Sequence, residues 1–255
     1  MPAVSINILT KNRVDLLKEA LQSVARQNFS DYEVIIIDDG STDSTEEQLK
    51  NLPFSEFKVI RHEKSLGIIA SRQEALETSR GEFVAVLDDD DVWVDTDKLK
   101  KQLEYFFAHP KCVLVGGGRM VFDPKKDTNK GHLPYITRPE NDADIRRSML
   151  FRNNFFTSTV MFKRQAAVQA GGFITDGIDV AEDYDLWLRL GKIGEMYNFQ
   201  EVFDKYRLPS YNKDTIRKFY TKQAALIRKQ KMYYPYYFFA LLFIKIRIYF
   251  SYYGG

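Results

Sequence analysis

The sequence predicts an α/β protein in which a mostly parallel central sheet is flanked by helices. The main evidence is a strand-like apolar run followed by a stretch of helical periodicity, repeated four times in the first 110 residues. This alternation favours parallel strands joined by helices that cover the sheet. A chain of 255 residues, 44% hydrophobic and 28% charged, can also bury one large core. Finally, residues 211–255 are basic and aromatic and predict a C-terminal helical extension.

The first 110 residues contain the four predicted strand–helix units. The predicted strands are 3–9, 33–37, 57–60 and 84–87. The helices that follow them are predicted to begin near Val14, Ser44, Ile69 and Leu99. Asn12 is the expected N-cap of the first helix, and Gly81 is expected to end the third.

The pattern is looser in the second half of the chain. The predicted strands are 113–115, 120–122 and 157–162, and the predicted helices are 164–170 and 183–190. The glycines at 116–118 are expected to interrupt the strand and so separate 113–115 from 120–122. The polar residues 123–142 are expected to form a loop or flap.

Four consecutive acids, Asp88 to Asp91, directly follow the fourth predicted strand. Adjacent carboxylates repel one another, so a cation or water must compensate their charge. One interpretation is a solvated acidic turn, and the other is a divalent cation site, since Mg²⁺ takes one or two carboxylates together with substrate phosphates. The first strand leads into Thr10 and Arg13, and the second into Asp38 and Asp39. Because ligands bind at this edge of open α/β sheets, the binding site is favoured.

Several other nucleotide and metal sites are excluded. A dinucleotide-binding fold needs glycines after the first strand, and residues 10–13 contain none. The chain has no Gly-x-x-x-x-Gly-Lys-Ser/Thr loop, and its acidic run lacks the glycine and final glutamate of an EF-hand. His62, His109 and His132 lack metal-ligand spacing and are expected at surface or incidental positions. Cys112 lies in an apolar run and is expected to be a buried thiol.

Seven short motifs occur in a fixed order between residues 3 and 210. They are Thr10-Lys11-Asn12-Arg13, Asp38-Asp39-Gly40-Ser41-Thr42-Asp43, Leu66-Gly67 with Ala70-Ser71-Arg72, Gly81-Glu82-Phe83, Leu87-Asp88-Asp89-Asp90-Asp91, Gly171-Gly172-Phe173 and Glu182-Asp183-Tyr184-Asp185-Leu186-Trp187-Leu188. The ordered set resembles glycosyltransferase family 2. This resemblance implies the GT-A (Rossmann-like) fold, a nucleotide-sugar donor, a Mg²⁺ or Mn²⁺ ion and inversion at the anomeric carbon. It also implies a catalytic domain over 1–210, with a nucleotide-binding half (1–110) and an acceptor-binding half (111–210).

The resemblance assigns site residues position by position. The residues expected to bind the nucleotide are Thr10, Arg13, Asp38, Asp39, Arg72, Asp88 and Asp89. Asp39 is the expected partner of a base N–H, with the adjacent Asp38 as the alternative, and Arg72 is expected near the ribose or diphosphate. Asp90 is expected to bind the metal and Asp88 to face the ribose, as the two acids of an Asp-x-Asp motif. A register shifted by one residue stays open, because the intervening residue is also acidic.

Asp183 resembles the catalytic base of the family. It follows Glu182 at the start of a predicted helix, whose dipole favours the ionised carboxylate. The alternative is that Asp183 only caps this helix. As the base, Asp183 would take the proton of an acceptor hydroxyl, while the cation on Asp90 would offset charge on the leaving diphosphate. The residues expected near the acceptor or the donor sugar are Gly172, Glu182, Trp187 and Arg207.

The expected function is transfer of a sugar from a nucleotide-sugar to a hydroxyl of a glycan or lipid-linked acceptor in surface polysaccharide biosynthesis. A UDP-sugar is the expected donor. Single addition is expected, because the Gln-x-x-Arg-Trp motif and the membrane helices of processive synthases are missing. One alternative is a sugar-phosphate nucleotidyltransferase, which favours a glycine-rich basic loop after the first strand. The other is a non-catalytic nucleotide-sugar binding module, which leaves Asp183 without a role.

The C-terminal part of the chain is strongly basic. From Lys205 onward there are eleven Lys or Arg and one acid, a net charge of +10, so the preceding residues carry −8 of the total of +2. The apolar run 232–250 is too short and too interrupted to span a bilayer, but its Tyr and Phe suit a membrane interface. We therefore expect residues 211–255 to bind an anionic membrane surface, with the protein cytoplasmic and peripheral to the inner face of the cell membrane. The alternative is packing on the body or in a homodimer, and no nucleic acid is expected.

Overall fold

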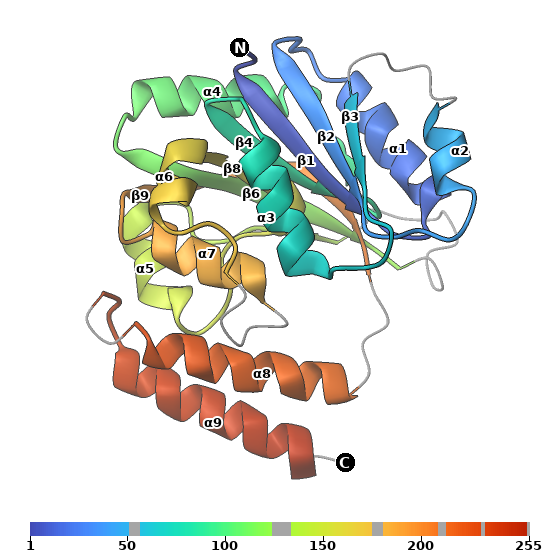
Figure 1. Cartoon of the computed structure of the whole chain (residues 1–255). Helices are drawn as coiled ribbons and strands as arrows, with labels where there is room; N and C mark the ends of the chain where they lie inside the picture. Colours follow the sequence, from blue (N-terminus) through green and yellow to red (C-terminus); the bar gives the residue numbers. More distant parts are fainter. Residues whose placement is uncertain (51–56, 124–133, 175–180, 209–212, 231–232, 254–255) are drawn as a thin grey trace.

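One continuous sheet runs through the molecule (Figure 1). The computed structural model describes residues 1–50, 57–123, 134–174, 181–208, 213–230 and 233–253. Within these residues the sheet has nine strands in the order β3-β2-β1-β4-β8-β6-β9-β5, with β7 paired to β6. The strands of both predicted halves of the catalytic domain therefore hydrogen-bond into the same sheet.

The first half of the chain has the predicted repeat of strands and helices. The parallel strands are β1 (Val4–Thr10), β2 (Tyr32–Asp38), β3 (Phe57–Arg61) and β4 (Phe83–Asp88). The helices are α1 (Val14–Ala25), α2 (Thr45–Lys50), α3 (Ile68–Thr78) and α4 (Lys98–Ala108). The predicted α/β class and its four strand–helix units are confirmed.

Strand β4 shows how the sheet is covered on both faces. Its side chains alternate between two hydrophobic clusters, because successive residues of a strand point to opposite faces. Ala85 and Leu87 belong to the cluster that includes helices α1 and α4, whereas Val84 and Val86 belong to the cluster that includes α3. A fully buried strand therefore carries its terminal aspartates to the edge of the core.

Two predicted helix ends are wrong. Arg13, not Asn12, is the N-cap residue of α1, and Asn12 instead adopts a left-handed conformation with φ of 55°. The Asn12 side-chain oxygen accepts hydrogen bonds from the backbone N–H groups of Thr42 (2.7 Å) and Asp43 (3.3 Å). Asn tolerates this conformation, and here it ties the loop after β1 to the loop after β2. Helix α3 ends at Thr78, and its C-cap residue is Ser79, two residues before the predicted Gly81.

The rest of the sheet, from β5 onward, mixes parallel and antiparallel strands. The strands are β5 (Val92–Trp93), β6 (Cys112–Phe122), β7 (Tyr135–Ile136), β8 (Met161–Lys163) and β9 (Glu195–Arg207). The helices are α5 (Asp142–Met149), the 3₁₀ turn η1 (Thr157–Thr159), α6 (Arg164–Gln169) and α7 (Glu182–Leu190). Strand β8 is antiparallel to both β4 and β6, while β6 and β9 are parallel. The predicted helices 164–170 and 183–190 are confirmed as α6 and α7.

The predicted break at the three glycines is wrong, because β6 continues through them with shifts of register. A Cβ atom at Gly116 would collide with Asn198 and Phe155, and one at Gly117 would collide with the Phe203 ring. The glycines therefore make room for large side chains against the strand.

The segments around the glycine strand also differ from the prediction. The segment predicted as strand 157–162 begins with the 3₁₀ turn η1 and becomes β8 only at Met161. The predicted loop or flap 123–142 contains β7, and its residues 124–133 lie outside the described ones. Helix α5, which starts at Asp142, was not predicted at all.

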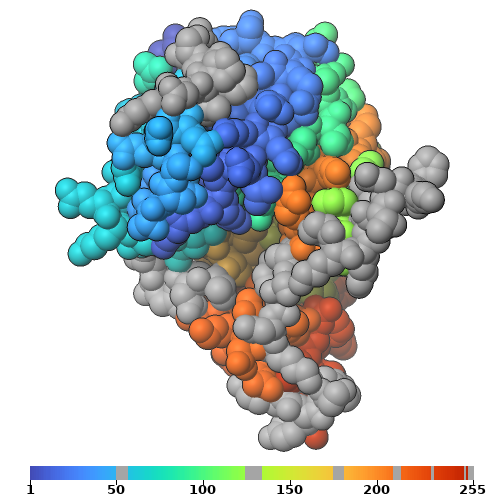
Figure 2. Space-filling view, turned by 90° about the vertical axis from the view of Figure 1, so that its right-hand side faces the viewer, coloured from blue at the N-terminus to red at the C-terminus, as the bar shows by residue number. Residues whose placement is uncertain are grey.

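The predicted C-terminal extension forms a pair of helices, here called the C-terminal hairpin (residues 213–230 and 233–253). Helices α8 (Lys213–Arg228) and α9 (Tyr237–Tyr253) lie side by side below α7 in Figure 1, and Figure 2 shows them at the end of the molecule opposite the N-terminal strands. Ile227, Ala240 and Ile244 are buried in the same cluster as Leu188 of α7. No helix among the described residues combines the length and hydrophobicity needed to cross a bilayer.

Candidate active site

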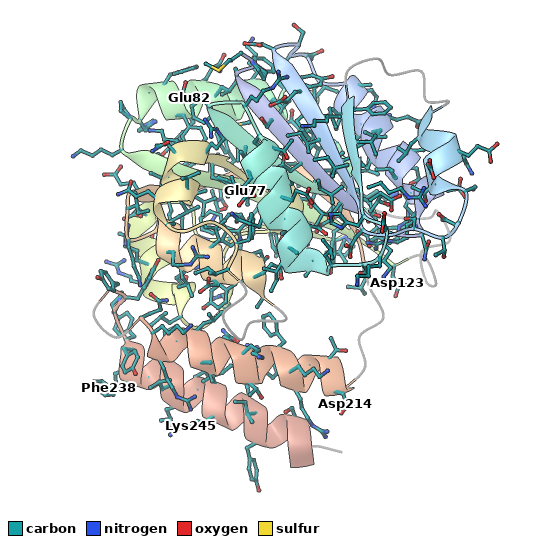
Figure 3. All side chains as sticks on the ribbon, in the orientation of Figure 1. Glu77, Glu82, Asp123, Asp214, Phe238 and Lys245 are labelled. Atoms are coloured by element: carbon teal, nitrogen blue, oxygen red, sulfur yellow. The ribbon has the colours of Figure 1, made fainter. Side chains whose placement is uncertain are left out.

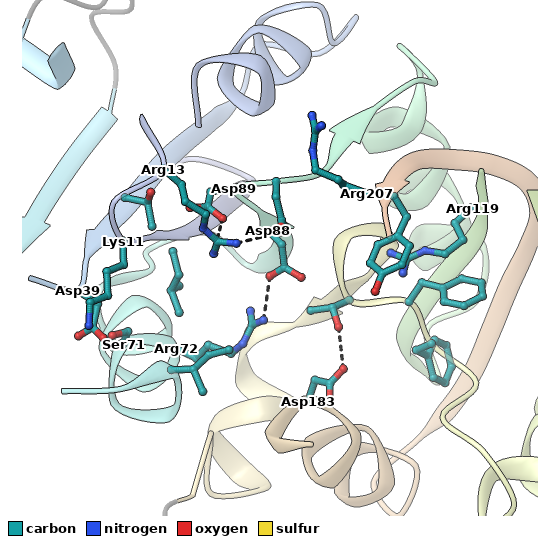
Figure 4. A pocket seen from close by; sticks show the side chains of 18 of the residues that line it. Lys11, Arg13, Asp39, Ser71, Arg72, Asp88, Asp89, Arg119, Asp183 and Arg207 are labelled. Carbon is teal, nitrogen blue, oxygen red and sulfur yellow. Dashed lines mark hydrogen bonds and ion pairs between the residues drawn. The ribbon is translucent and has the colours of Figure 1, made fainter. Parts of the chain in front are cut away.

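A pocket of about 630 Å³ opens where the parallel strands end (Figure 4). Its walls come from both halves of the chain. The lining residues are Leu9, Thr10, Lys11, Arg13, Asp39, Ile68, Ser71, Arg72, Asp88, Asp89, Asp90, Arg119, Arg138, Asn153, Phe155, Phe156, Thr157, Asp183, Tyr206 and Arg207. In Figure 4 Asp39 and Arg13 lie on one side, Arg119 and Arg207 lie on the other, and Asp88, Arg72 and Asp183 lie between them.

Arg13 joins the end of β1 to the acidic run. Its guanidinium contacts Asp89 at 2.7 Å and Asp90 at 2.9 Å. The β1 residue Thr10 is paired in register with Asp38 of β2, so the ends of the two strands lie level. The strand ends predicted to meet at one edge of the sheet therefore do so.

The two acids that follow β2 have different surroundings. Asp38 is fully buried, accepts the Ser41 N–H at 2.9 Å, and is absent from the pocket lining. Asp39 lines the pocket, but its carboxylate already accepts hydrogen bonds from the side chains of His62 and Ser65 and from the backbone N–H groups of Leu66 and Gly67. Although burial opposes it, these hydrogen bonds hold the pKa of Asp39 well below its usual range.

His62 is not the surface or incidental residue that its spacing indicated. It is buried, with Nδ1 at 2.8 Å from Asp39 and Nε2 at 2.6 Å from Glu74. Burial opposes its charge, yet the hydrogen bonds to Glu74 and Asp39 raise the pKa of the imidazole. His62 therefore links the loop after β2 to helix α3.

The four acids after β4 divide into two buried and two accessible side chains. The side chains of Asp89 and Asp91 are 0% and 1% exposed, whereas those of Asp88 and Asp90 are 33% and 27% exposed. Asp91 points inward, where Ser158 donates to it at 2.5 Å and the Arg207 N–H at 3.2 Å. The first and third acids of the run are therefore partly accessible to solvent, and the second and fourth are buried.

Burial and neighbouring carboxylates both disfavour the ionised form of the acids in this run. Burial raises the pKa of Asp89 to about 7. Burial and then the charge of Asp88 raise the pKa of Asp90, and burial and Asp204 raise that of Asp91. A divalent cation would relieve this repulsion, and two accessible carboxylates suit a hard cation that also takes substrate phosphates. Among the described residues, no group of three or more His, Cys, Asp or Glu side chains is arranged to hold a metal ion by itself.

Arg72 connects the acidic run to helix α7. It is only 5% exposed, and its guanidinium contacts Asp88 and Glu182, each at 2.9 Å. Burial opposes the charge, but Asp88 and Glu182 raise the pKa of the guanidinium. Glu182 is absent from the lining and acts through Arg72. Two further predicted residues are also outside the lining, since Trp187 is fully buried beside Phe162 and Gly172 packs against Gln73.

Asp183 lines the pocket from the first turn of α7. The N-cap position belongs to Ala181, and the Oδ1 of Asp183 accepts the backbone N–H of Tyr184 at 2.6 Å in the first turn of the helix. Its Oδ2 accepts hydrogen bonds from the Thr157 hydroxyl at 2.7 Å and from the Asn153 amide at 3.2 Å. These two donors fix the carboxylate at the centre of the pocket, between the acidic run and the second half of the chain.

Sequence reasoning missed most of the opposite wall. The missed residues are Arg119, Arg138, Asn153, Phe155, Phe156 and Thr157. Arg119 is buried and bound to Asp204 at 2.5 Å, and behind this pair Lys98 is fully buried, so that its pKa falls to about 7. These residues come from inside strands and from connecting segments, and none belongs to a motif that ends a strand.

The fold and the pocket define an open α/β protein with a carboxylate-rich site at the carboxyl ends of parallel strands. Comparison with known proteins identifies the family. The family model described as "Glycosyl transferase family 2" matches residues 5–170. The chain therefore belongs to glycosyltransferase family 2 and is a glycosyltransferase.

The similarity extends over most of the chain. A putative teichuronic acid biosynthesis glycosyltransferase, TuaG of Bacillus subtilis, is 30% identical over 81% of this chain and 79% of its own length. The amylovoran biosynthesis glycosyltransferase AmsE of Erwinia amylovora is 26% identical over 82% of this chain and 77% of its own length.

Solved structures support the GT-A fold. S. aureus TarS 1–349, in complex with UDP-GlcNAc, has a TM-score of 0.73 at 17% identity, covering 98% of this chain and 73% of that one. The mannosyltransferase PcManGT from Pyrobaculum calidifontis, in complex with GDP-Man and Mn²⁺, has a TM-score of 0.68 at 18% identity, covering 97% of this chain and 69% of that one. The predicted GT-A architecture is thereby confirmed.

Proposed function

We propose that the protein transfers a single sugar from a UDP-sugar to a hydroxyl of a glycan or lipid-linked acceptor in surface polysaccharide biosynthesis, with inversion. The observation that carries this proposal is that Asp183 and the accessible acids Asp88 and Asp90 line one pocket. Relatives named for teichuronic acid, amylovoran and colanic acid biosynthesis support the pathway class. The UDP and UDP-GlcNAc bound by TarS support the donor class.

In this proposal the acceptor hydroxyl lies against Asp183. The carboxylate takes the hydroxyl proton while the oxygen attacks the anomeric carbon, and the bond from that carbon to the diphosphate oxygen breaks. Thr157 and Asn153 hold the carboxylate in place through its Oδ2 atom. Attack from the Asp183 side, opposite the leaving diphosphate, inverts the anomeric centre.

The nucleoside diphosphate lies on the other side of the reacting carbon. Thr10, Arg13 and Asp39 would line its nucleoside end, and Arg72 would lie beside the ribose or diphosphate. Asp39 can meet a base N–H only by giving up one of the four donors that already surround it. Asp90, with Asp88 beside it, would hold Mg²⁺ or Mn²⁺, which when bound offsets negative charge on the departing diphosphate.

The test is an assay of product release. The full chain is incubated with Mn²⁺, a panel of UDP- and GDP-sugars, and a bacterial membrane fraction as the source of acceptors. Release of a nucleoside diphosphate from one of the UDP-sugars is the expected outcome. Release of pyrophosphate from a nucleoside triphosphate and a sugar 1-phosphate would instead identify a nucleotidyltransferase. Binding of a nucleotide sugar without either product would identify a binding module.

The C-terminal hairpin supplies the second part of the proposal, attachment to the cytoplasmic face of an anionic membrane. Helix α9 buries one face against the body, and its outer face exposes a row of apolar side chains. These are Phe238 (73% exposed), Phe239 (65%), Leu242 (58%), Ile246 (46%) and Tyr249 (59%). Figure 3 shows Phe238 and Lys245 on the outer side of the hairpin.

The charge of the same region favours this membrane over a second protein copy. From Lys213 onward there are nine Lys or Arg and one acid, a net charge of +8, and each Lys or Arg near an anionic surface contributes about 1 kcal/mol. A second copy of the hairpin would bring two such cationic surfaces together, which is unfavourable. An apolar row flanked by cations is instead the pattern of an interfacial helix. A membrane position would also bring the active site near a lipid-linked acceptor.

A further inference from the structure

The wall of the pocket beyond Asp183 is cationic and aromatic. The guanidinium of Arg119 lies 3.9 Å from the centroid of the Tyr206 ring and 4.5 Å from that of Phe156. The guanidinium of Arg138 also lies over Phe156, at 4.7 Å. Cations over aromatic faces are attracted by the ring quadrupole, so the stack holds the two guanidinium groups in fixed positions.

The two arginines differ in how their charge is compensated. Arg119 is bound to Asp204 at 2.5 Å and lies 3.5 Å from Asp91, so protein carboxylates neutralise it. Arg138 has no ion pair with a carboxylate of the described residues, and its Nε atom is buried without a hydrogen-bond partner. Its charged neighbours are cations. Burial and then the charges of Arg152 and Arg119 lower the pKa of Arg138.

An uncompensated guanidinium beside other cations is unfavourable in a folded chain, unless a ligand supplies the missing negative charge. The planar fork of Arg is suited to bind the two oxygens of a phosphate or carboxylate. The position of Arg138 in the pocket lining makes such an anion accessible to it. The unpaired cation is therefore best explained as part of a binding site.

The position of Arg138 and Phe156 in the pocket indicates whether the donor or the acceptor carries the anion. Phe156 directly precedes Thr157, whose hydroxyl donates to Asp183. The Arg138 guanidinium therefore lies next to the residue that holds the proposed base. The accessible acids and Arg72 lie on the nucleotide side of Asp183, where the donor diphosphate is expected, whereas Arg119 lies on the far side in Figure 4. An anion at Arg138 belongs to the molecule whose hydroxyl meets Asp183.

From this juxtaposition we infer that Arg138 and Phe156 form an oxyanion subsite for the acceptor, and that the acceptor carries a phosphate or carboxylate close to its reacting hydroxyl. This inference rests on the proposed function, because it needs Asp183 to face the acceptor. It narrows the substrate class from any glycan to an anionic one. The donor plays no part in it, so the subsite can be measured without sugar transfer.

The experiment measures binding of matched charged and neutral probes by calorimetry. The full chain is first saturated with Mg²⁺, UDP and GDP, so that the probes cannot occupy the diphosphate region. One arm compares glycerol 3-phosphate with glycerol, and the other compares glucuronate with glucose. In at least one arm the charged probe is expected to bind about tenfold or more tightly than its neutral partner, the range of a charge-assisted hydrogen bond. The arm that responds identifies phosphate or carboxylate as the anion.

The variants locate the effect. Arg138→Gln is expected to remove the preference for the charged probe, and Arg138→Lys, which keeps the charge without the fork, to reduce it. Arg147→Gln is the matched control, because Arg147 is exposed on α5, is absent from the lining, and removes the same charge. Equal binding of charged and neutral probes to the wild type, no binding of either, or an unchanged preference in Arg138→Gln would overturn the inference.

A donor arm separates this inference from its nearest competitor. If Arg138 instead held an acidic donor sugar, Arg138→Gln would weaken binding of UDP-glucuronate relative to UDP-glucose and leave the small probes unaffected. That result would reject the acceptor subsite. The transfer assay tests the proposed function separately, because the absence of nucleoside diphosphate release would reject that function and not the anion subsite. A chain without transferase activity could still show or lack the charged-probe preference.

Discussion

The two walls of the pocket are built in different ways. On the wall proposed to bind the nucleotide (the nucleotide wall), acidic and basic residues lie at or just after the ends of parallel strands and pair with one another, as Arg13 does with Asp89 and Asp90. On the wall proposed to face the acceptor (the acceptor wall), Arg119 comes from inside β6 and Arg138 from the segment between β7 and α5, and both lie on aromatic rings. The first wall is fixed by the parallel sheet, whereas connecting segments can change without disturbing it. Under the proposed function, this difference would let the same kind of donor site be combined with different acceptors.

The Arg72–Glu182 pair joins the nucleotide wall to helix α7, which carries Asp183, so breaking it tests how far that wall depends on this helix. Arg72→Met leaves Glu182 buried without its cation, and removal of one partner of a buried pair typically costs about 3–5 kcal/mol. We expect the largest loss of stability among the variants described here, measured by urea unfolding. Arg80→Met is the control, since Arg80 is 69% exposed in its pair with Glu33 and should cost less than about 1 kcal/mol.

The double variant makes this test specific. Arg72→Met combined with Glu182→Gln removes the unpaired charge and should be more stable than Arg72→Met alone, because a neutral amide is less costly to bury. If the single variant were as stable as Arg80→Met, or if the double variant lost more than the single one, the nucleotide wall would not be coupled to α7 through this pair.

The hairpin packs against α7, and changes to its exposed face have a smaller expected effect. Replacing Phe238, Phe239, Leu242 and Ile246 with Ser should lower binding to vesicles of phosphatidylcholine and phosphatidylglycerol about tenfold or more, because apolar area is lost from the outer face. Cosedimentation measures the bound fraction. These side chains are exposed, so the fold should be retained, whereas deleting α9 would also remove core residues such as Ile244.

Two controls define the membrane result. Phe107→Ser removes an apolar side chain that is 68% exposed on α4 and should leave vesicle binding unchanged. Added salt should weaken binding to the anionic vesicles, because it screens the cations of the hairpin. Equal cosedimentation of the fourfold variant and the wild type would contradict the membrane proposal.

The contrast between the walls also explains what the sequence could predict. Thr10 and Asp88 were expected at the site because each directly follows a recognisable apolar strand and because parallel strands end at one edge. The expected roles of Arg13 and Asp90, a few residues further on, came from the family resemblance. Arg119 and Arg138 were not found, since nothing in their local sequence indicates that they would meet over Phe156. Only the register of β6 and β9 and the path of the chain before η1 bring them together.

Predictions from local sequence patterns were also wrong where contacts between distant parts of the chain determine the structure. Gly116 and Gly117 suggested a break, but they allow Phe155 and Phe203 to pack against a continuous strand. The spacing of His62 indicated no role, although it connects Asp39 to Glu74. In both cases the residue acts through partners far away in sequence, which periodicity does not reveal.

The most direct test of Asp183 as the general base is to measure donor binding and sugar transfer separately in Asp183→Asn. Asparagine keeps the shape of the side chain and can accept the Thr157 hydroxyl, but it cannot take a proton from the acceptor. The dissociation constant of the nucleotide sugar should stay close to that of the wild type, while turnover falls about 10²- to 10⁴-fold, the usual contribution of a general base. Unchanged turnover in Asp183→Asn would show that Asp183 is not the general base.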